Sequence, residues 1–281
     1  MKFNKALLIV SLLVTALGFS ACDNNDDYVP GAFAGEHNIG FDSEENLVMG
    51  MTNTEISVVL TRANTEGELT IPLQALMVPE CMTMPKSVTF ADGSATADVK
   101  VSVSEEMKTF TEYQLSFRIP EEYSNAYAAD GKSPIFNITV KKEDFKVVAN
   151  GVFNSAFWFE DSWEQDLEYS PILGLFRIPN CYAEGSHWYF LFDGADNFTF
   201  CDSEGTPVDK FLSGFVHPSY GEVSVTVLGA NPMGYVTGIE GWEGVFRFPL
   251  QFTVSAGSFG AGYEYYYVSN WQEKPWETNA E

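Results

Sequence analysis

Residues 87–103 read SVTFADGSATADVKVSV, and this stretch decides the fold. From residue 95 to residue 103 every second side chain is apolar, and the side chains between them are Thr, Asp, Lys and Ser. A period of two places the apolar side chains on one face of a β-strand and the polar ones on the other. Asp92-Gly93 is a turn signal just before this strand. The stretch therefore predicts an antiparallel strand with one face in a core and one face in water.

The same alternation recurs along the chain, at residues 113–119, 223–227 and 246–254. Turn signals such as Asp130-Gly131 and Asn231-Pro232 separate the alternating runs. No long helical period is present, and residues 121–129 predict one short helical turn at most. These patterns predict an all-β protein of two antiparallel β-sandwich domains.

The composition of the strands changes near residues 141–150. Before this point they are built from Val, Ile, Leu and Thr; after it aromatic residues take over, and all six tryptophans lie in the second half. The charged segment Lys141-Lys142-Glu143-Asp144 reads as a link between domains. We therefore predict a first domain over residues 40–143 and an aromatic-rich β-sandwich over residues 144–281.

Three segments of the first domain resemble the Calx-beta type of immunoglobulin-like sandwich. Residues 87–93 match that family's V-T-F-x-x-G turn, residues 55–62 its early strand and residues 136–140 its last strand. The likeness covers about residues 40–142 and implies an immunoglobulin-like fold. The acids that bind calcium in some members have no match here, so the resemblance implies no calcium site.

The second domain resembles the aromatic-rich C-terminal domains of Bacteroidetes surface lipoproteins of uncharacterised function. The likeness rests on Gly151-Val152-Phe153, on residues 176–180 with Tyr182, and on residues 257–260. Many such proteins are encoded among glycan-uptake systems, so this resemblance implies sugar binding.

The first 21 residues predict a secretory signal. Lys2 and Lys5 precede an apolar run over residues 6–19, and Ser20-Ala21-Cys22 follows. The run has 14 residues, whereas a membrane span needs ~20. The segment resembles a bacterial lipoprotein signal, which implies that Cys22 becomes the lipidated first residue.

Residues 22–39 predict an acidic tether. The cluster Asp23-Asn24-Asn25-Asp26-Asp27 resembles the export signal of Bacteroidetes surface lipoproteins, and it also reads as a plain solvated tether. The resemblance implies a protein anchored by lipid in the outer membrane of the cell and facing the exterior. Attachment by acyl chains holds a protein at a membrane without spanning it.

The charge of the chain narrows the choice of partners. The formal net charge is −24. A surface this acidic repels phosphate backbones, so we predict that nucleic acid is not a partner.

No set of catalytic residues stands out. The only histidines are His37, His187 and His217, and no nucleophile elbow, phosphate-binding glycine loop or metal-type spacing occurs. His187 neighbours the apolar run that starts at Trp188, which indicates a partly buried strand end. The sequence predicts a protein that is not an enzyme and has no cofactor and no metal.

Three local features leave alternatives open. The run Asp193-Gly194-Ala195-Asp196-Asn197 fits a weak calcium site or a hairpin turn. Cys181 and Cys201 fit a disulfide, or they act with Cys81 as buried thiols. Five acids near Trp158 fit either a hydrolase cleft or a charged loop at a strand end: Glu160, Asp161, Glu164, Asp166 and Glu168.

Tryptophans supply the binding candidates, because flat rings pack against the apolar face of a sugar. Trp188 is expected in the core, and Trp276 is expected to anchor the tail. Tyr263, Tyr265, Tyr266 and Tyr267 form a further run whose alternate members face opposite ways. The glycan-binding candidates are Trp158, Trp163, Trp242 and Trp271.

These features together predict a non-catalytic cell-surface lipoprotein that binds glycan in association with a polysaccharide-uptake system. Its expected partners are the outer membrane, through the lipid anchor, a polysaccharide or oligosaccharide, and proteins of the uptake system. The alternative is a structural or adhesive surface protein that contacts a protein partner through strand edges or loops.

Overall fold

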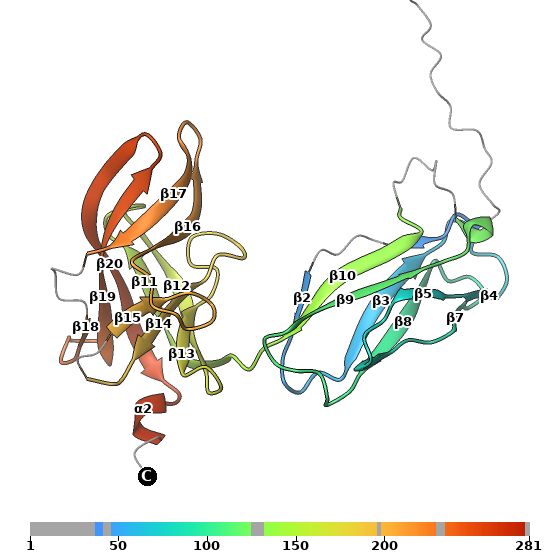
Figure 1. Cartoon of the computed structure of the whole chain (residues 1–281), viewed down its shortest axis with the longest axis horizontal. Coiled ribbons are helices and arrows are strands. Elements are labelled where there is room, and N and C mark those ends of the chain that lie inside the picture. The colour runs from blue at the N-terminus through green and yellow to red at the C-terminus, as the bar shows by residue number, and fades with distance from the viewer. Residues whose placement is uncertain (1–36, 42–45, 125–131, 196–197, 229–233, 279–281) are drawn as a thin grey trace, which may run out of the picture. The chain divides into compact units, whose positions relative to one another are not determined.

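The computed structural model describes residues 37–41, 46–124, 132–195, 198–228 and 234–278 (Figure 1). The signal peptide, Cys22 and the tether up to residue 36 lie outside these residues. The chain divides into two compact units. Within the described residues the first holds 37–47, 54–107 and 112–140, and the second holds 48–53, 108–111 and 141–278. In that part of the chain, no helix has the length and apolar character to cross a membrane.

Two four-stranded antiparallel sheets form the first sandwich. One sheet has the order β1 (Gly40–Phe41), β3 (Glu55–Thr61), β8 (Thr96–Val103) and β6 (Met82–Thr83). The other has the order β2 (Asn46–Met49), β10 (Ile135–Lys142), β9 (Glu112–Arg118) and β5 (Gln74–Met77). A separate pair joins β4 (Leu69–Pro72) to β7 (Ser87–Phe90), and the only helical turn is η1 (Glu121–Tyr123) among the residues described.

The alternation that opens this section sets the register of the first sandwich. In β8 every second residue is buried, and Val99 lies opposite Val58 of β3 in the ladder. The buried faces of β3 and β8 therefore coincide, and their apolar side chains fill one core. The predicted strand and the predicted immunoglobulin-like sandwich are confirmed.

A buried arginine fixes the turn before β8. The guanidinium of Arg62 donates to the carbonyl oxygens of Ser94 (2.7 Å), Ala91 (2.8 Å) and Gly67 (2.9 Å). These bonds satisfy carbonyls that the tight turn at Gly93 leaves without strand partners. They explain how a charged side chain that is 4% exposed is tolerated here.

One ten-stranded antiparallel sheet forms the second unit. Its order is β15-β14-β13-β12-β11-β20-β19-β17-β16, with β18 paired to β19. The strands on the first side are β11 (Lys146–Ser155), β12 (Asp161–Ser170), β13 (Leu175–Ile178), β14 (Trp188–Phe192) and β15 (Phe198–Cys201). Those on the other side are β16 (Lys210–His217), β17 (Gly221–Val227), β18 (Gly234–Val236), β19 (Gly244–Val254) and β20 (Gly257–Trp271). A short helix, α2 (Pro275–Thr278), follows.

The expected second sandwich takes the form of this single sheet curled onto itself. Trp188 of β14 lies 5.4 Å from Phe211 of β16, although seven strands separate these two in the sheet order. Phe190 likewise lies 5.3 Å from Phe246 of β19. The inner face is dense with large rings, so bending the sheet around them removes more apolar area from water than a flat sheet would.

Glycine allows the close approach of the first and last strands of this sheet. At Gly151 of β11 a Cβ atom would lie 2.1 Å from the carbonyl oxygen of Tyr267 in β20. The register between the two strands shifts between Asn150 and Gly151, as it does at a β-bulge. Figure 1 shows β16–β17 and β19–β20 as two long hairpins at one end of this unit.

Candidate functional site

Aromatic rings from three chain connections meet at the hairpin end of the second unit. The ring centroid of Phe259, on β20, lies 5.0 Å from Trp158, 5.3 Å from His217 and 5.9 Å from Tyr220. We call the set the hairpin-tip cluster, and its members are Trp158, Phe159, Phe215, His217, Tyr220 and Phe259. They come from the β11–β12 turn, the β16–β17 hairpin and the start of β20, so the fold joins segments far apart in sequence.

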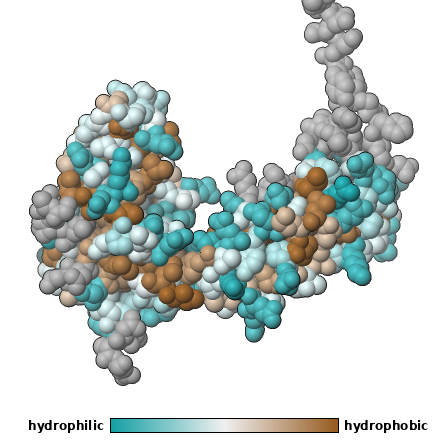
Figure 2. All heavy atoms as spheres, in the orientation of Figure 1, coloured by the Kyte–Doolittle hydropathy of each residue, from teal (hydrophilic) through white to brown (hydrophobic). Residues whose placement is uncertain are grey.

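Part of this cluster faces water. Tyr220 is 52% exposed and Phe259 is 38% exposed, and Leu212 and Val216 on the same β16–β17 hairpin are exposed too. In Figure 2, apolar residues lie among polar ones on the drawn face of this unit. Exposed rings grouped with aliphatic side chains mark a surface that binds something.

Two shallow hollows lie on either side of Tyr220. The first has a volume of about 300 Å³ and is lined by Tyr220, Val254, Ala256, Gly257, Ser258 and Phe259. The second has a volume of about 350 Å³ and is lined by Lys210, Leu212, Tyr220, Glu222, Ser224, Val254 and Ser255. Each combines a ring with hydroxyl groups, and the second adds one cationic and one anionic side chain. Rings with a few polar groups are what a small polar ligand with an apolar face requires.

Short-range hydrogen bonds hold the hairpin tips in shape. The backbone N–H of Ser219 donates to Nδ1 of His217 at 3.1 Å, and the N–H of Gly260 donates to Oγ of Ser258 at 3.0 Å. The same hydroxyl of Ser258 donates to the carbonyl oxygen of Phe252 at 3.3 Å. The rings that flank the hollows are therefore carried on turns with fixed backbones.

A buried acid lies beneath the cluster. Glu264 of β20 is fully buried, and its Oε1 accepts the backbone N–H of Trp158 at 3.0 Å. Its Oε2 is buried with no hydrogen-bond partner. Loss of solvation outweighs the hydrogen bonds that the carboxyl accepts, and it raises the pKa of Glu264 to about 7.

Ser155 holds the other side of the same turn. Its Oγ accepts the N–H of Phe159 at 3.0 Å and lies 3.3 Å from the hydroxyl of Tyr182. Burial, together with the nearby Glu264, raises the pKa of Tyr182, so this hydroxyl stays protonated. Two buried polar side chains, Glu264 and Ser155, thus position the turn that carries Trp158 and Phe159.

Two of the four predicted tryptophans lie at this end of the unit. Trp158 stacks on Phe252 with centroids 4.8 Å apart. Trp163 stacks on Phe153 at 5.2 Å, and its Nε1 donates to Oε1 of Gln165 at 3.2 Å. Both rings are partly buried, so they support the hairpin-tip cluster from below.

The other two predicted tryptophans lie elsewhere on the second unit. Trp242 packs against Tyr267 on the outer face of β20, with centroids 5.1 Å apart. Trp271 donates from its Nε1 to the hydroxyl of Tyr235 at 2.9 Å and meets Trp276 of α2 at 5.0 Å. The structure therefore spreads the four tryptophans over three places. As expected, Trp188 is in the core and Trp276 packs the tail onto it.

Sequence reasoning missed Phe159, Tyr220 and Phe259. The only signal for them was position: each ring stands beside or within a turn that joins two strands. The Gly257-Ser258-Phe259-Gly260 run was noticed only as part of a likeness to other proteins. That Phe259 meets Tyr220 depends on the pairing of β17 with β19, which no local pattern specifies.

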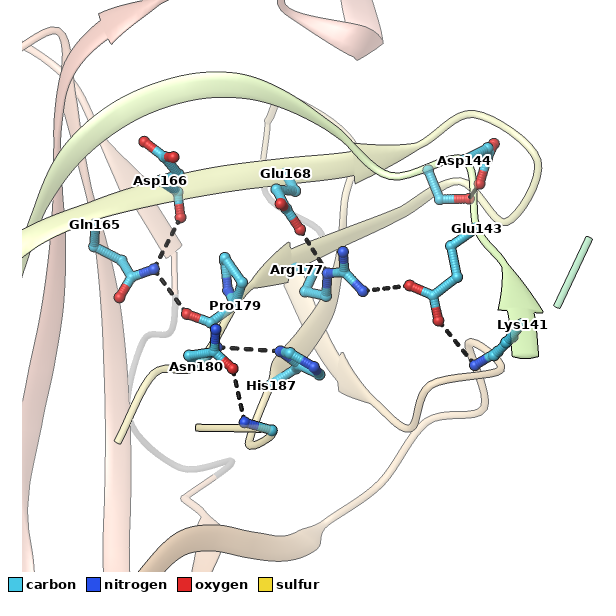
Figure 3. Close-up of polar contacts among 12 residues, drawn as sticks. Lys141, Glu143, Asp144, Gln165, Asp166, Glu168, Arg177, Pro179, Asn180 and His187 are labelled. Carbon is cyan, nitrogen blue, oxygen red and sulfur yellow. Dashed lines mark hydrogen bonds and ion pairs between the residues drawn. The ribbon is translucent and has the colours of Figure 1, made fainter. Parts of the chain in front are cut away.

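An ion-pair network involves one acid of the predicted cluster (Figure 3). Arg177 donates from Nε to Glu168 and from Nη1 to Glu143, both at 2.6 Å. Lys141 contacts the other oxygen of Glu143 at 2.9 Å. Burial alone would raise the pKa of Glu143, but the hydrogen bonds from Lys141 and Arg177 outweigh it and lower that pKa. Glu168 and Glu143 are therefore held as paired carboxylates.

The remaining acids of the predicted cluster do not gather around one point. Asp166 accepts from Nδ2 of Asn150 at 2.6 Å, and Asp161 accepts the backbone N–H of Ser162 at 2.8 Å. Glu160 and Glu164 are exposed. This arrangement fits the charged loop and strand face better than a cleft with two facing carboxyls.

The histidine, cysteine and calcium alternatives have local outcomes. His187 is partly buried, and its Nδ1 accepts the N–H of Asn180 at 3.1 Å. Cys81, Cys181 and Cys201 are buried free thiols, and burial raises the pKa of Cys181. Asp193 and Ala195 form a turn through an N–H bond to the carboxylate, while residues 196–197 lie outside the described part. Over the residues that are described, no three metal-binding side chains converge.

No family model and no curated protein sequence match the chain. Among solved structures it is similar to a Bacteroides ovatus protein of unknown function, at 8% identity and a TM-score of 0.35, over 83% of this chain and 94% of that one. The apo form of the Calx CBD1 domain matches at 11% and 0.29, over 38% and 98%. An auxiliary nutrient binding protein from Bacteroides thetaiotaomicron matches at 8% and 0.30, over 80% and 89%. These likenesses are coarse, and the fold described above stands on the strands of this chain.

Proposed function

We propose that this protein is a non-catalytic lipoprotein that binds glycan through the hairpin-tip cluster. The observation that carries the proposal is the pair of hollows around Tyr220, which combine exposed rings with hydroxyl groups on rigid turns. A pyranose has apolar faces that pack on a ring and hydroxyl groups at its rim that seek hydrogen bonds. Tyr220 and Phe259 supply the rings, and Ser224, Ser258 and Glu222 supply polar partners.

The acidity of the chain limits the ligand. With a net charge of −24, the surface repels polyanions. Within the hollows Lys210 faces Glu222, so the lining itself has no excess of positive charge. We therefore propose a neutral glycan rather than a uronic or sulfated one.

The test is a screen by affinity electrophoresis of the full chain, in detergent, through gels that contain soluble glucans, xylans, mannans or polygalacturonate. We expect retardation by at least one neutral polysaccharide and none by polygalacturonate. Tyr220→Ala and Phe259→Ala should each weaken binding about five- to tenfold, because each removes one stacking ring. Ile172→Ala is the matched control, because Ile172 is exposed but lies on the β12–β13 turn. Equal binding by all four proteins would contradict the proposed site.

The lipid anchor and the location at the cell surface are part of the same proposal. They rest on the signal-like first 21 residues and on Cys22. Mass spectrometry of the protein from membranes should find an acylated chain that begins at Cys22. Cys22→Ser should release the protein from the membrane fraction, because acyl chains provide the attachment. A chain that keeps residues 1–21, or an unmodified Cys22, would refute the anchor.

One observation favours the alternative, a protein-contact role. Strand β5 ends its sheet, and all four of its residues are exposed, including Leu76 and Met77. Together with Ile135 they line an apolar hollow of about 300 Å³. An exposed strand edge beside apolar side chains can accept a strand of another protein. If Met77→Lys, and not Tyr220→Ala, reduced adhesion of cells that display the protein to a protein-coated surface, this role would replace glycan binding.

A further inference from the structure

A second line of aromatic rings runs along the outer face of β20. Tyr263, Tyr265 and Tyr267 alternate with Glu264 and Tyr266, both of which are fully buried. The three tyrosines therefore share the face of the sheet that points away from the core, and each is partly exposed.

The rings follow one another at near-constant spacing. Centroids of Tyr263 and Tyr265 lie 6.0 Å apart, and those of Tyr265 and Tyr267 lie 5.9 Å apart, with interplanar angles of 23° and 35°. Trp242, from the loop before β19, extends the line at 5.1 Å from Tyr267. We call these four residues the tyrosine row.

Polar side chains flank the row on the neighbouring strands. Asn154 of β11 lies opposite Tyr265 in the ladder, and Arg247 of β19 lies opposite it on the other side. Neighbouring strands are about 5 Å apart, so these groups stand within reach of a ligand that lies on the rings. Amide and guanidinium groups bind the hydroxyl groups of a sugar well, because they offer donors in fixed geometry.

Hydrogen bonds hold the amides next to the row. Nδ2 of Asn154 donates to Oγ of Ser162 at 2.7 Å, and Nδ2 of Asn150 donates to Asp166 at 2.6 Å. Nε2 of Gln272 in turn donates to Oδ1 of Asn150 at 2.7 Å. Side chains that are already ordered lose less entropy when a ligand binds.

A structural role alone is the competing explanation. Ring contacts on one face of a sheet stabilise it by themselves. Trp242 is not explained in this way, because it belongs to a turn outside the ladder and still extends the line of rings. The nearby acids Glu164 and Asp166 are exposed, which disfavours an anionic occupant.

We propose that the tyrosine row is a second glycan-binding surface, which takes several consecutive units of a neutral, extended polysaccharide chain. Each ring packs against the apolar face of one sugar unit, and the flanking amides and Arg247 bind hydroxyl groups along the chain. The inference shares only its ligand class with the proposed function. The hairpin-tip cluster and the tyrosine row are separate sets of residues, so each can be removed without the other.

The experiment compares long and short ligands by isothermal titration calorimetry on the full chain in detergent. The probes are the neutral polysaccharide that retards the protein most in the gel screen and its oligosaccharides of two sugar units. Tyr265→Ala, at the centre of the row, should weaken binding of the polymer about three- to tenfold. Tyr265→Phe keeps the ring and should bind the polymer within about twofold of the wild type. Binding of the two-unit oligosaccharide should not change in either variant.

The outcomes separate the two proposals. Ser269→Ala, on the same strand beyond the row, is the matched control, and thermal unfolding monitored by circular dichroism checks that each variant is folded. If Tyr220→Ala weakens binding while Tyr265→Ala binds the polymer like the control, the row is structural only and this inference is wrong. If Tyr265→Ala weakens polymer binding while Tyr220→Ala does not, the inference stands and the proposed hairpin-tip site is wrong. Absence of binding by the wild type to every probe overturns both.

Discussion

Glu264 is the residue whose environment makes the sharpest prediction. It is a fully buried carboxyl that accepts the N–H of Trp158, and its pKa of about 7 lies above the value of 4.5 that the unfolded chain would have. A carboxyl with a raised pKa in the folded state binds a proton there more tightly than in the unfolded state. Its stabilising contribution is therefore complete below pH 4.5 and is lost as the pH rises through 7.

We expect Glu264→Gln to remove this dependence. Between pH 5 and pH 8 the free energy of unfolding of the wild type should fall by roughly 2 kcal/mol relative to that of the variant. Urea denaturation of both proteins at pH 5, 6, 7 and 8 measures the difference, and groups common to both proteins cancel. A difference that stays constant with pH would show that Glu264 titrates normally.

At the scale of single residues, the sequence could predict which tryptophans exist but not what they touch. Ser162-Trp163-Glu164 and Asn270-Trp271-Gln272 look alike as local patterns. In the structure Trp163 supports the hairpin end, whereas Trp271 packs on Tyr235 and Trp276. The difference arises from partners far away in the chain, and a pattern of neighbours carries no information about them.

The β11–β12 turn is the element on which the candidate site depends. Phe157 of this turn packs on the backbone of β20, and a Cβ atom at Gly262 would lie 2.4 Å from its ring. The absence of a side chain at Gly262 thus lets the turn sit against the strand. This contact and the bond from Trp158 to Glu264 place the turn beside the other two tips.

We expect Gly262→Ala to push this turn away from β20. Overpacking at a rigid contact costs about 2 kcal/mol, and the loss of Trp158 support should also weaken glycan binding. Gly234→Ala is the matched control, because that glycine lies in β18 with no atom near the added Cβ. Thermal unfolding and gel retardation of the two variants, side by side, test the idea. Equal behaviour would mean that the turn is not held by this contact.

At the scale of elements, prediction succeeded where one face of a strand is buried. The runs at residues 96–103, 223–227 and 246–254 are strands β8, β17 and part of β19, because a period of two is visible in the sequence itself. The curl of the second sheet was not predicted. It follows from β11 pairing with β20, which are more than a hundred residues apart, and from the bulge at Gly151.

For the whole molecule, two β units of different composition divide the work. Aliphatic side chains fill the first core, and rings fill the second, which also carries both aromatic surfaces. A neutral surface ligand is consistent with a net charge of −24, because only an uncharged polymer approaches such a surface without repulsion. The proposed anchor at Cys22 would keep both surfaces at the exterior of the cell.

The most direct measurement is a calorimetric titration of the full chain with the neutral polysaccharide that the gel screen selects. The wild type, the Tyr220→Ala/Phe259→Ala double variant and the Ile172→Ala control are compared at one pH and salt concentration. Loss of both exposed rings should weaken the polymer about tenfold or more and leave the control unchanged. If the double variant, still folded, bound the polymer as tightly as the wild type, the hairpin tips would not be the glycan site.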